Sequence, residues 1–171
     1  MNKKKLLLAV SLKKQFGTSL IEVLIAVVVM SVGLVGLAAL QTLSLKNNHS
    51  AYLRTQATFL AYDMVDRMRA NVSSAQSGSY VVGIGTAPSG TTNCNTSACT
   101  ASDLANFDTN EWKCALGNWD SSSTCSTTLS MTGMLPGGDG AVTQAGTIHT
   151  VSVRWNDRDG LQRTFQVSTE L

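Results

Sequence analysis

The stretch "KKQFGTSLIEVLIAVVVMSVGLVGLAAL", residues 13–40, joins a basic cluster to a long apolar run. From Val23 to Leu45 the chain has 23 residues without a charged side chain, most of them Leu, Val, Ala or Ile. At about 1.5 Å per residue, a helix of this length crosses the hydrocarbon core of a bilayer. The sequence therefore predicts a membrane-spanning helix over about residues 20–45. Glu22, near its beginning, is costly to place in hydrocarbon, which makes it a functional candidate.

The basic residues are distributed unevenly along the chain. Five of the 13 Lys and Arg residues precede Gly17, and no acid does. Few basic residues follow the apolar run, so the N-terminus is expected in the cytoplasm and the rest of the chain beyond the inner membrane, in the periplasm. Without the first 17 residues, 8 scattered basic residues face 11 acids. Binding to a phosphate backbone needs a clustered basic surface, so no nucleic-acid partner is predicted.

The N-terminus has two simpler interpretations, a secretory signal peptide and an uncleaved membrane anchor. Residues 6–10, "LLLAV", resemble the apolar part of a secretory signal peptide, but they are followed by Lys13 and Lys14 rather than by a small-residue cleavage site. The longer run over 23–45 exceeds the usual length of such a segment. A plain uncleaved membrane anchor remains open.

The helix is predicted to continue beyond the membrane. Apolar residues recur at spacings of three and four, the pattern of an amphipathic helix, at Leu53, Ala57, Leu60, Ala61, Met64, Val65 and Met68. Asp63 and Arg67 form an i,i+4 pair that supports it. Asn71 and the Ser-rich segment after it end the pattern. One helix is therefore expected over about residues 19–72, with its second half packed on a small domain.

The remaining chain combines short elements with turn sequences. Residues 79–84, "SYVVGI", are typical of a strand, and 135–140, "LPGGDG", of a turn. Residues 102–119 predict a helix capped by Ser102 or Asp103. Its inward-facing residues are expected to be Leu104, Phe107, Trp112, Ala115 and Leu116.

The clearest β signal lies at the C-terminal end. Residues 147–155 alternate so that His149, Val151, Val153 and Trp155 share one face. After "NDRDG", the last strand places Leu161, Phe165 and Val167 together, and residues 140–144 extend the hairpin into a meander. The predicted fold class is α+β, a long N-terminal helix packed on a small antiparallel β-sheet domain.

All four cysteines lie beyond the predicted anchor, where disulfides form. They allow three connectivities, and sequence alone does not choose among them. Local spacing favours Cys94–Cys99 together with Cys114–Cys125. The rival, a zinc site, lacks the paired C-x2-C spacing and a nearby histidine. No metal site is predicted.

Catalysis is not predicted either. His49 and His149 are far apart in sequence and have no plausible grouping with a nucleophile or an acid. Asp157 and Asp159 lack the further ligands of a calcium loop and are better explained by a tight turn. We therefore expect no enzyme activity and no cofactor.

The stretch over 13–40 resembles the class III signal of type IV pilins and of type II secretion pseudopilins. That pattern is a basic leader, a glycine, a cleavage point, four mostly apolar residues, a glutamate and a long apolar helix. The resemblance implies cleavage by a prepilin peptidase between Gly17 and Thr18, and N-methylation of Thr18. It also implies that Glu22 pairs with a terminal amine and sets subunit register. Phe16 precedes the glycine, whereas the family usually has Phe after it, and Ala39 replaces a helix-bending proline common in major pilins.

Later segments resemble one branch of minor pilins, the type IV pilus modification proteins called PilV. They are "AYDMVDRMRAN", "DLANFDTNEW", "LPGGDG" and "TVSVRWND". The resemblance implies a structural subunit that primes pilus assembly with other minor pilins and the major pilin, at the tip and in some cases beneath an adhesin. A minor pseudopilin of type II secretion and a signal-anchored periplasmic binding module are the alternatives.

The expected organisation is a cleaved leader over 1–17, a long helix over 18–75 and a periplasmic domain over 76–171. The chain is expected in the inner membrane before assembly and in the pilus afterwards.

Overall fold

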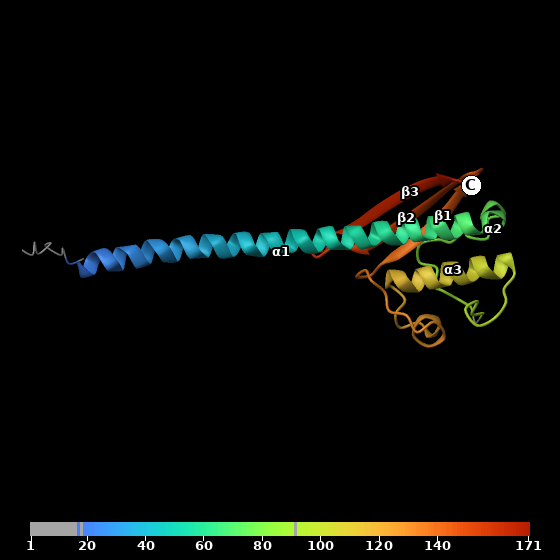
Figure 1. Ribbon diagram of the computed structural model, residues 1–171, viewed down its shortest axis with the longest axis horizontal. Coiled ribbons are helices and arrows are strands. Elements are labelled where there is room, and N and C mark those ends of the chain that lie inside the picture. The colour runs from blue at the N-terminus through green and yellow to red at the C-terminus, as the bar shows by residue number, and fades with distance from the viewer. Residues whose placement is uncertain (1–16, 18, 91) are drawn as a thin grey trace, which may run out of the picture. The chain divides into compact units, whose positions relative to one another are not determined.

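The computed structural model describes residues 17, 19–90 and 92–171. The leader residues 1–16 and Thr18, to which the cleavage and methylation predictions refer, lie outside the described residues. The chain divides into two units, one ending at Leu43 and the other comprising Ser44–Leu171, and each is described by itself. Helix α1 (Leu20–Ala70) contributes to both (Figure 1).

In the first unit, the described residues after Ser19 are helical and exposed. Large apolar side chains expose between 53% and 84% of their surface over Leu20–Leu45. Within the described part of the chain, α1 is the one helix long and apolar enough to cross a membrane, with a mean hydropathy of 2.8 over its most apolar window. The large apolar side chains of this segment are therefore not buried within the first unit.

In the second unit, α1 supplies one face of the hydrophobic core. The predicted residues at spacings of three and four, from Leu53 to Met68, are all buried. They form one cluster with residues of α3, β1 and β2. The helix ends at Ala70, and a separate short helix, α2 (Val72–Gln76), follows. The helix expected to about residue 72 is thus interrupted at Asn71, which leaves helical geometry and whose Nδ2 donates to Ala101 O at 2.7 Å.

Helix α3 spans Ala101–Leu116. Its N-cap is Thr100, whose hydroxyl accepts from the backbone N–H of Asp103 while the Asp103 carboxylate accepts from Thr100 N–H, a reciprocal capping box. The predicted cap at Ser102 or Asp103 is thus displaced by two or three residues. The helix stops at Gly117, which has φ 115°, rather than at residue 119. Leu104 was predicted to face inward but is 36% exposed.

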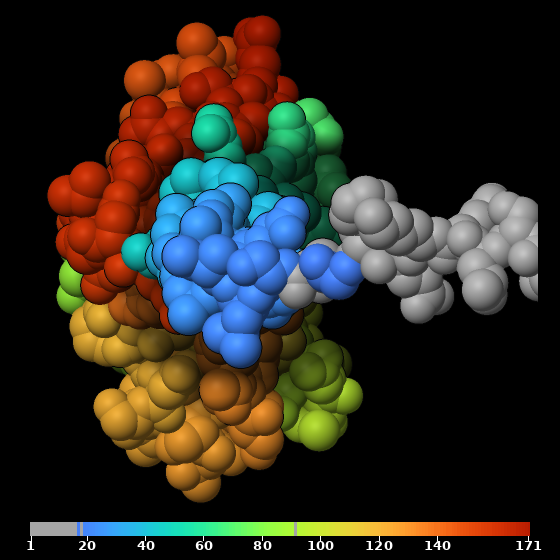
Figure 2. All heavy atoms as spheres, turned by 90° about the vertical axis from the view of Figure 1, so that its left-hand side faces the viewer, coloured from blue at the N-terminus to red at the C-terminus, as the bar shows by residue number. Residues whose placement is uncertain are grey.

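The sheet has three antiparallel strands in the order β1 (Asp139–Ala145), β2 (Ile148–Asn156) and β3 (Gln162–Glu170). In both views β3 lies at one side of the second unit and the segment between α3 and β1 at the other (Figures 1 and 2). Val151 pairs with Val142 and with Val167. His149, Val151, Val153 and Trp155 are buried, as the alternation predicts. The predicted α+β class, with a long helix packed on a small antiparallel sheet, is confirmed.

Two details of the β prediction are wrong. Leu161 precedes β3 and is 56% exposed, because the turn between β2 and β3 extends to it through the bond from Asp157 N–H to Leu161 O. Residues 79–84 form no extended strand. They make one bridge, Val82 to Val142, and place Tyr80 in the core. The apolar residues of this segment are typical of a strand, but the segment pairs with β1 through this one bridge only.

Gly140 tests the packing between α3 and the sheet. A Cβ at this position would overlap Trp112 Cη2 and would lie 2.9 Å from Leu116 Cδ1. We expect Gly140→Ala to lower the free energy of unfolding by about 1–3 kcal/mol through overpacking. Thermal unfolding of the full chain in detergent measures this. The matched control is Gly83→Ala, whose nearest neighbour would be Thr86 Oγ1 at 3.4 Å. Equal stability of the two variants would contradict the packing described.

Candidate functional site

Glu22 lies in the first turn of α1, two residues after the helix begins. Its backbone N–H donates to Ser19 O at 3.0 Å, and Val23 N–H donates to the same oxygen at 3.3 Å. An acid at this position is favoured by the partial positive charge of a helix N-terminus. Its side chain forms no ion pair with the residues that the structure describes. The carboxylate is exposed and available to a charge supplied from elsewhere.

Gly17 is exposed and lies outside the helix. A Cβ built at this position would meet no described atom within 4 Å, and its φ does not lie in the left-handed region. Neither sterics nor backbone geometry in the described chain therefore requires glycine here.

Two hydroxyl side chains of the apolar half of α1 are satisfied by their own helix. Ser31 Oγ donates to Val28 O at 2.7 Å, and Thr42 Oγ1 donates to Ala38 O at 3.0 Å. Such bonds to the preceding turn remove the need for an outside partner. The segment thus presents an almost entirely apolar surface with one carboxylate at its start.

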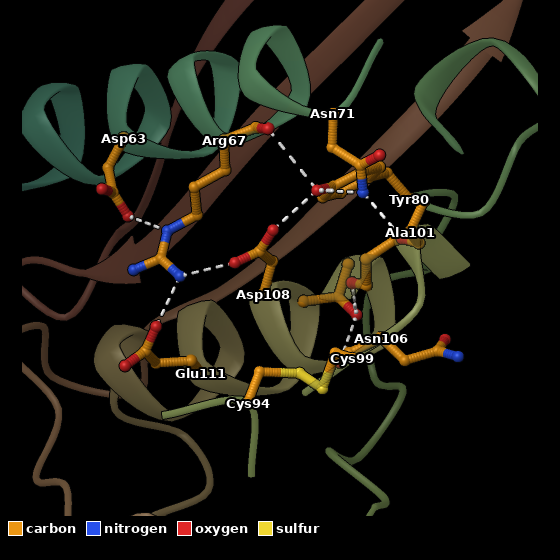
Figure 3. Close-up of polar contacts among 12 residues, drawn as sticks. Asp63, Arg67, Asn71, Tyr80, Cys94, Cys99, Ala101, Asn106, Asp108 and Glu111 are labelled. Atoms are coloured by element: carbon orange, nitrogen blue, oxygen red, sulfur yellow. Dashed lines mark hydrogen bonds and ion pairs between the residues drawn. A yellow bond between two sulfur atoms is a disulfide. The ribbon is translucent and has the colours of Figure 1, made fainter. Parts of the chain in front are cut away.

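A second polar centre joins α1 to α3 within the larger unit (Figure 3). Arg67 on α1 reaches three carboxylates: Nε lies 2.9 Å from Asp63 Oδ2, and Nη1 lies 3.0 Å from Asp108 Oδ1 and 2.5 Å from Glu111 Oε2. Burial alone would lower the pKa of Arg67, but the hydrogen bond and charges from these acids raise it above its usual range. The guanidinium therefore remains charged and fixes the separation of the two helices.

Tyr80 continues this polar centre into the core. Its hydroxyl donates to Asp108 Oδ2 at 2.6 Å and accepts from Asn71 Nδ2 at 3.3 Å. Burial and the bond to Asp108 raise the pKa of Tyr80 above its ordinary value. The phenol stays protonated. The group holds the end of α1 against the start of α3 and offers no nucleophile or proton relay.

A buried ion pair links α3 to β1. Lys113 Nζ lies 2.6 Å from Asp139 Oδ1 and also donates to Gly83 O at 2.8 Å, and both side chains are at most 2% exposed. The Asp139 carboxylate accepts from the backbone N–H groups of Gly85 and Gly140 as well. These bonds offset the large cost of removing both charges from water. The pair fixes how α3 sits on the sheet.

The two disulfides close local loops. Cys94 is bonded to Cys99, and Cys114 to Cys125. The first lies in the loop before α3, and the second joins α3 to the short π-helical turn η1 (Thr124–Thr128). No cysteine is free. The described residues contain no group of three His, Cys, Asp or Glu side chains that could hold a metal ion.

The remaining residues singled out by the sequence have structural contacts. His149 is buried, with Nε2 at 3.0 Å from Ala75 O. Asp157 accepts from Ser50 Oγ and from Arg158 N–H, and Arg163 lies beside it. His49 is exposed on α1. The structure does not bring the two histidines into one cluster.

Sequence reasoning found the Asp63–Arg67 pair but missed its partners across the helix interface. It also missed the Lys113–Asp139 pair. A signal for Lys113 was present, because its spacing from Ala105, Thr109 and Leu116 places it on the buried side of α3. A charge at such a position requires a buried counter-charge.

Comparison with known families gives two adjoining matches. Residues 12–38 match the family model described as the prokaryotic N-terminal methylation motif, and residues 39–110 match the one described as type IV pilin Tt1218. No curated protein and no solved structure matches the chain. The two matches support the type IV pilin superfamily and a structural subunit that carries the methylation motif. Such a motif implies processing by a prepilin peptidase and assembly with other pilins.

The Lys113–Asp139 pair generates a pH prediction. Burial would raise the pKa of Asp139, but the bonds from Lys113, Gly85 and Gly140 lower it below its usual value. The unfolded chain therefore binds more protons at this carboxyl in acid, so its contribution to stability is present above about pH 4 and is lost as the pH falls through the folded-state pKa.

The change to make is Asp139→Asn, with unfolding by denaturant followed from about pH 7 down to pH 3. The natural chain should lose more stability over this range than the variant, which lacks this titration but is less stable at neutral pH. Identical slopes on the acid side would contradict a lowered pKa for Asp139.

Proposed function

We propose that this chain is a minor type IV pilin of the PilV branch. It is made as an inner-membrane protein with its N-terminus in the cytoplasm and residues 76–171 in the periplasm. Prepilin peptidase cuts between Gly17 and Thr18 and methylates Thr18. The mature chain then enters a pilus, where it primes assembly at the tip with other minor pilins and the major pilin, in some cases beneath an adhesin.

The observation that carries this proposal is the combination at the start of α1. No contact among the described residues requires glycine at position 17, since a Cβ there would meet no described atom within 4 Å and its backbone is not left-handed. A residue that a protein does not need for folding is well explained as part of a processing signal. Five residues later Glu22 stands at the head of a helix whose first half exposes its large apolar side chains.

The proposed cut supplies the partner for Glu22. Before cleavage, residue 18 contributes only a peptide N–H, whereas cleavage creates an amine with a positive charge. An opposite charge is worth much more to a carboxylate in a low-dielectric interior than in water, although desolvation offsets much of the gain. The pair is therefore best suited to fixing the register of adjacent subunits, and it discriminates against uncut chains.

The globular unit supports a structural rather than a catalytic role. Two of its charged groups join elements: Arg67 joins α1 to α3, and Lys113 joins α3 to β1. One disulfide closes part of the loop before α3, and the other joins α3 to η1. These contacts suit a domain that must stay folded while force or neighbouring subunits act on its long helix.

Cleavage is tested by mass spectrometry of the mature N-terminus in cells with and without prepilin peptidase. With the peptidase, we expect a start at Thr18 carrying one methyl group on the amine; without it, the chain should retain its leader. Gly17→Val should block the cut, and Gly33→Ala is the matched control, because a Cβ there also meets nothing within 4 Å. A start at Met1, or beyond Ala38, in competent cells would refute the proposal.

The role of Glu22 is tested by incorporation into sheared pili. We expect Glu22→Ala and Glu22→Gln to be cut normally but to fall about tenfold or more in the pilus fraction, a change equivalent to about 1.4 kcal/mol. Both variants remove the charge, and Gln keeps the side-chain size. Ser31→Ala is the control, because its hydroxyl bonds only to its own helix. Normal incorporation of Glu22→Gln would show that charge is not what Glu22 contributes.

The same fractions separate the alternatives. A type II pseudopilin would be cut in the same way but would depend on a secretion system, and its loss would impair export of secreted proteins instead of piliation. A signal-anchored binding module would tolerate changes at both Gly17 and Glu22.

A further inference from the structure

A polar cavity of about 250 Å³ lies within the second unit, beside the turn between β2 and β3. Its lining comes from α1 and from the adjoining ends of the two strands: Ser50, Arg54, Trp155, Asp157, Arg163 and Thr164. The bond from Ser50 Oγ to Asp157 ties the turn to the helix at this point. The cavity is thus built from segments about a hundred residues apart in the sequence.

The carboxylate in the lining is already engaged. Asp157 accepts from Ser50 Oγ and from Arg158 N–H, and Arg163 Nε lies 3.6 Å from Oδ2. The bonds from Ser50 and Arg158 lower the pKa of Asp157, so it stays ionised. Its oxygens therefore have little capacity left for a further donor.

The donors in the lining are in surplus. Arg54 makes no ion pair with any residue of the described ranges. Arg163 uses Nε and Nη2 on Asp157 and Asp159, which leaves Nη1 without a partner among described atoms. A ligand that complements this lining carries negative charge on several acceptor oxygens.

Charge in the second unit is segregated toward this cavity. Over residues 44–171 there are 8 basic and 10 acidic residues. Five of the basic residues line the cavity, adjoin its lining in sequence or lie one helical turn before Ser50, namely Lys46, Arg54, Arg154, Arg158 and Arg163, against two acids, Asp157 and Asp159. The other three share the unit with eight acids. The residues around the cavity therefore carry a net positive charge, and the rest of the unit carries a net negative one.

The place of the cavity along α1 indicates the source of the anion. Ser50 follows the end of the predicted membrane span, Leu45, by five residues on the same helix. We infer that the cavity binds the phosphate group of an anionic membrane lipid at the periplasmic surface, before the subunit leaves the membrane. This inference rests on the membrane topology of the proposed function. Each Lys or Arg near an anionic surface contributes about fivefold in affinity.

The experiment uses the full chain purified in a neutral detergent and titrated with dioctanoyl phosphatidylglycerol, with bound lipid followed by native mass spectrometry. Arg54→Gln should weaken binding about fivefold, and Arg54→Gln with Arg163→Gln by roughly 25-fold. The matched control is Arg69→Gln, also an exposed arginine of α1, which pairs with Asp66 and does not line the cavity. It should bind as the natural chain does.

Two further titrations identify the source of the phosphate. Dioctanoylglycerol, which has the same chains without the phosphate, should bind weakly and equally to all variants. Inorganic phosphate should bind more weakly than the lipid. Equal affinity for inorganic phosphate would overturn the assignment to a lipid, and lipid binding unaffected by Arg54→Gln and Arg163→Gln would overturn the site itself.

Folding and processing are controlled separately. Arg163→Gln removes contacts to Asp157 and Asp159, so the unfolding midpoints of all variants are compared. Arg54→Gln breaks no ion pair within the described residues. Loss of lipid binding by this variant at an unchanged midpoint supports the site directly. Cleavage after Gly17 is measured on the same variants. A chain that binds the lipid but is never cut would refute the proposed function and leave this site standing, whereas a chain that is cut but binds no lipid would do the reverse.

Discussion

The fold of the larger unit depends on burial of one face of α1 beneath the sheet and α3. Apolar side chains from Leu53 to Met68 form a single cluster with Trp112, Val142 and Val153. Trp112 fixes the crossing of α1 and α3, because its indole N–H donates to Leu60 O at 2.8 Å. Since the sheet has only three strands, it cannot enclose a core by itself. The second half of α1 is therefore an integral part of the domain.

The charged groups of the larger unit join particular pairs of elements. Arg67 holds α1 to α3 through Asp108 and Glu111, and Lys113 holds α3 to β1. Buried ion pairs contribute less to stability than well-packed apolar residues do, but they tolerate few alternative arrangements. These ion pairs therefore define how α1, α3 and the sheet are placed in the larger unit.

Much of the fold was predictable from the sequence because its signals are local. Apolar spacing in α1 and alternation in β2 gave the buried residues correctly from Leu53 to Met68 and from His149 to Trp155. Errors occurred where a distant contact decides local structure. Asn71 ends α1 by bonding Ala101, and buried Tyr80 belongs to a segment with only one bridge to β1.

The candidate sites divide in the same way. Gly17 and Glu22 are recognisable because their significance lies in spacing along the chain. The cavity at Arg54 and Arg163 was invisible, because these residues look scattered in sequence and become neighbours only when the hairpin folds back on α1. The sequence therefore predicted the net charge of the domain, but not the clustering of basic residues around this cavity.

The hydroxyl groups of Ser31 and Thr42, bonded to carbonyls of their own helix, have a consequence for movement between surroundings. A segment that relied on lipid headgroups or water for these bonds would have to break them on leaving the bilayer and remake them elsewhere. The hydroxyls of Ser31 and Thr42 keep their partners when the helix moves between lipid and a protein interior, whereas the carboxylate of Glu22 needs a partner supplied from outside the helix.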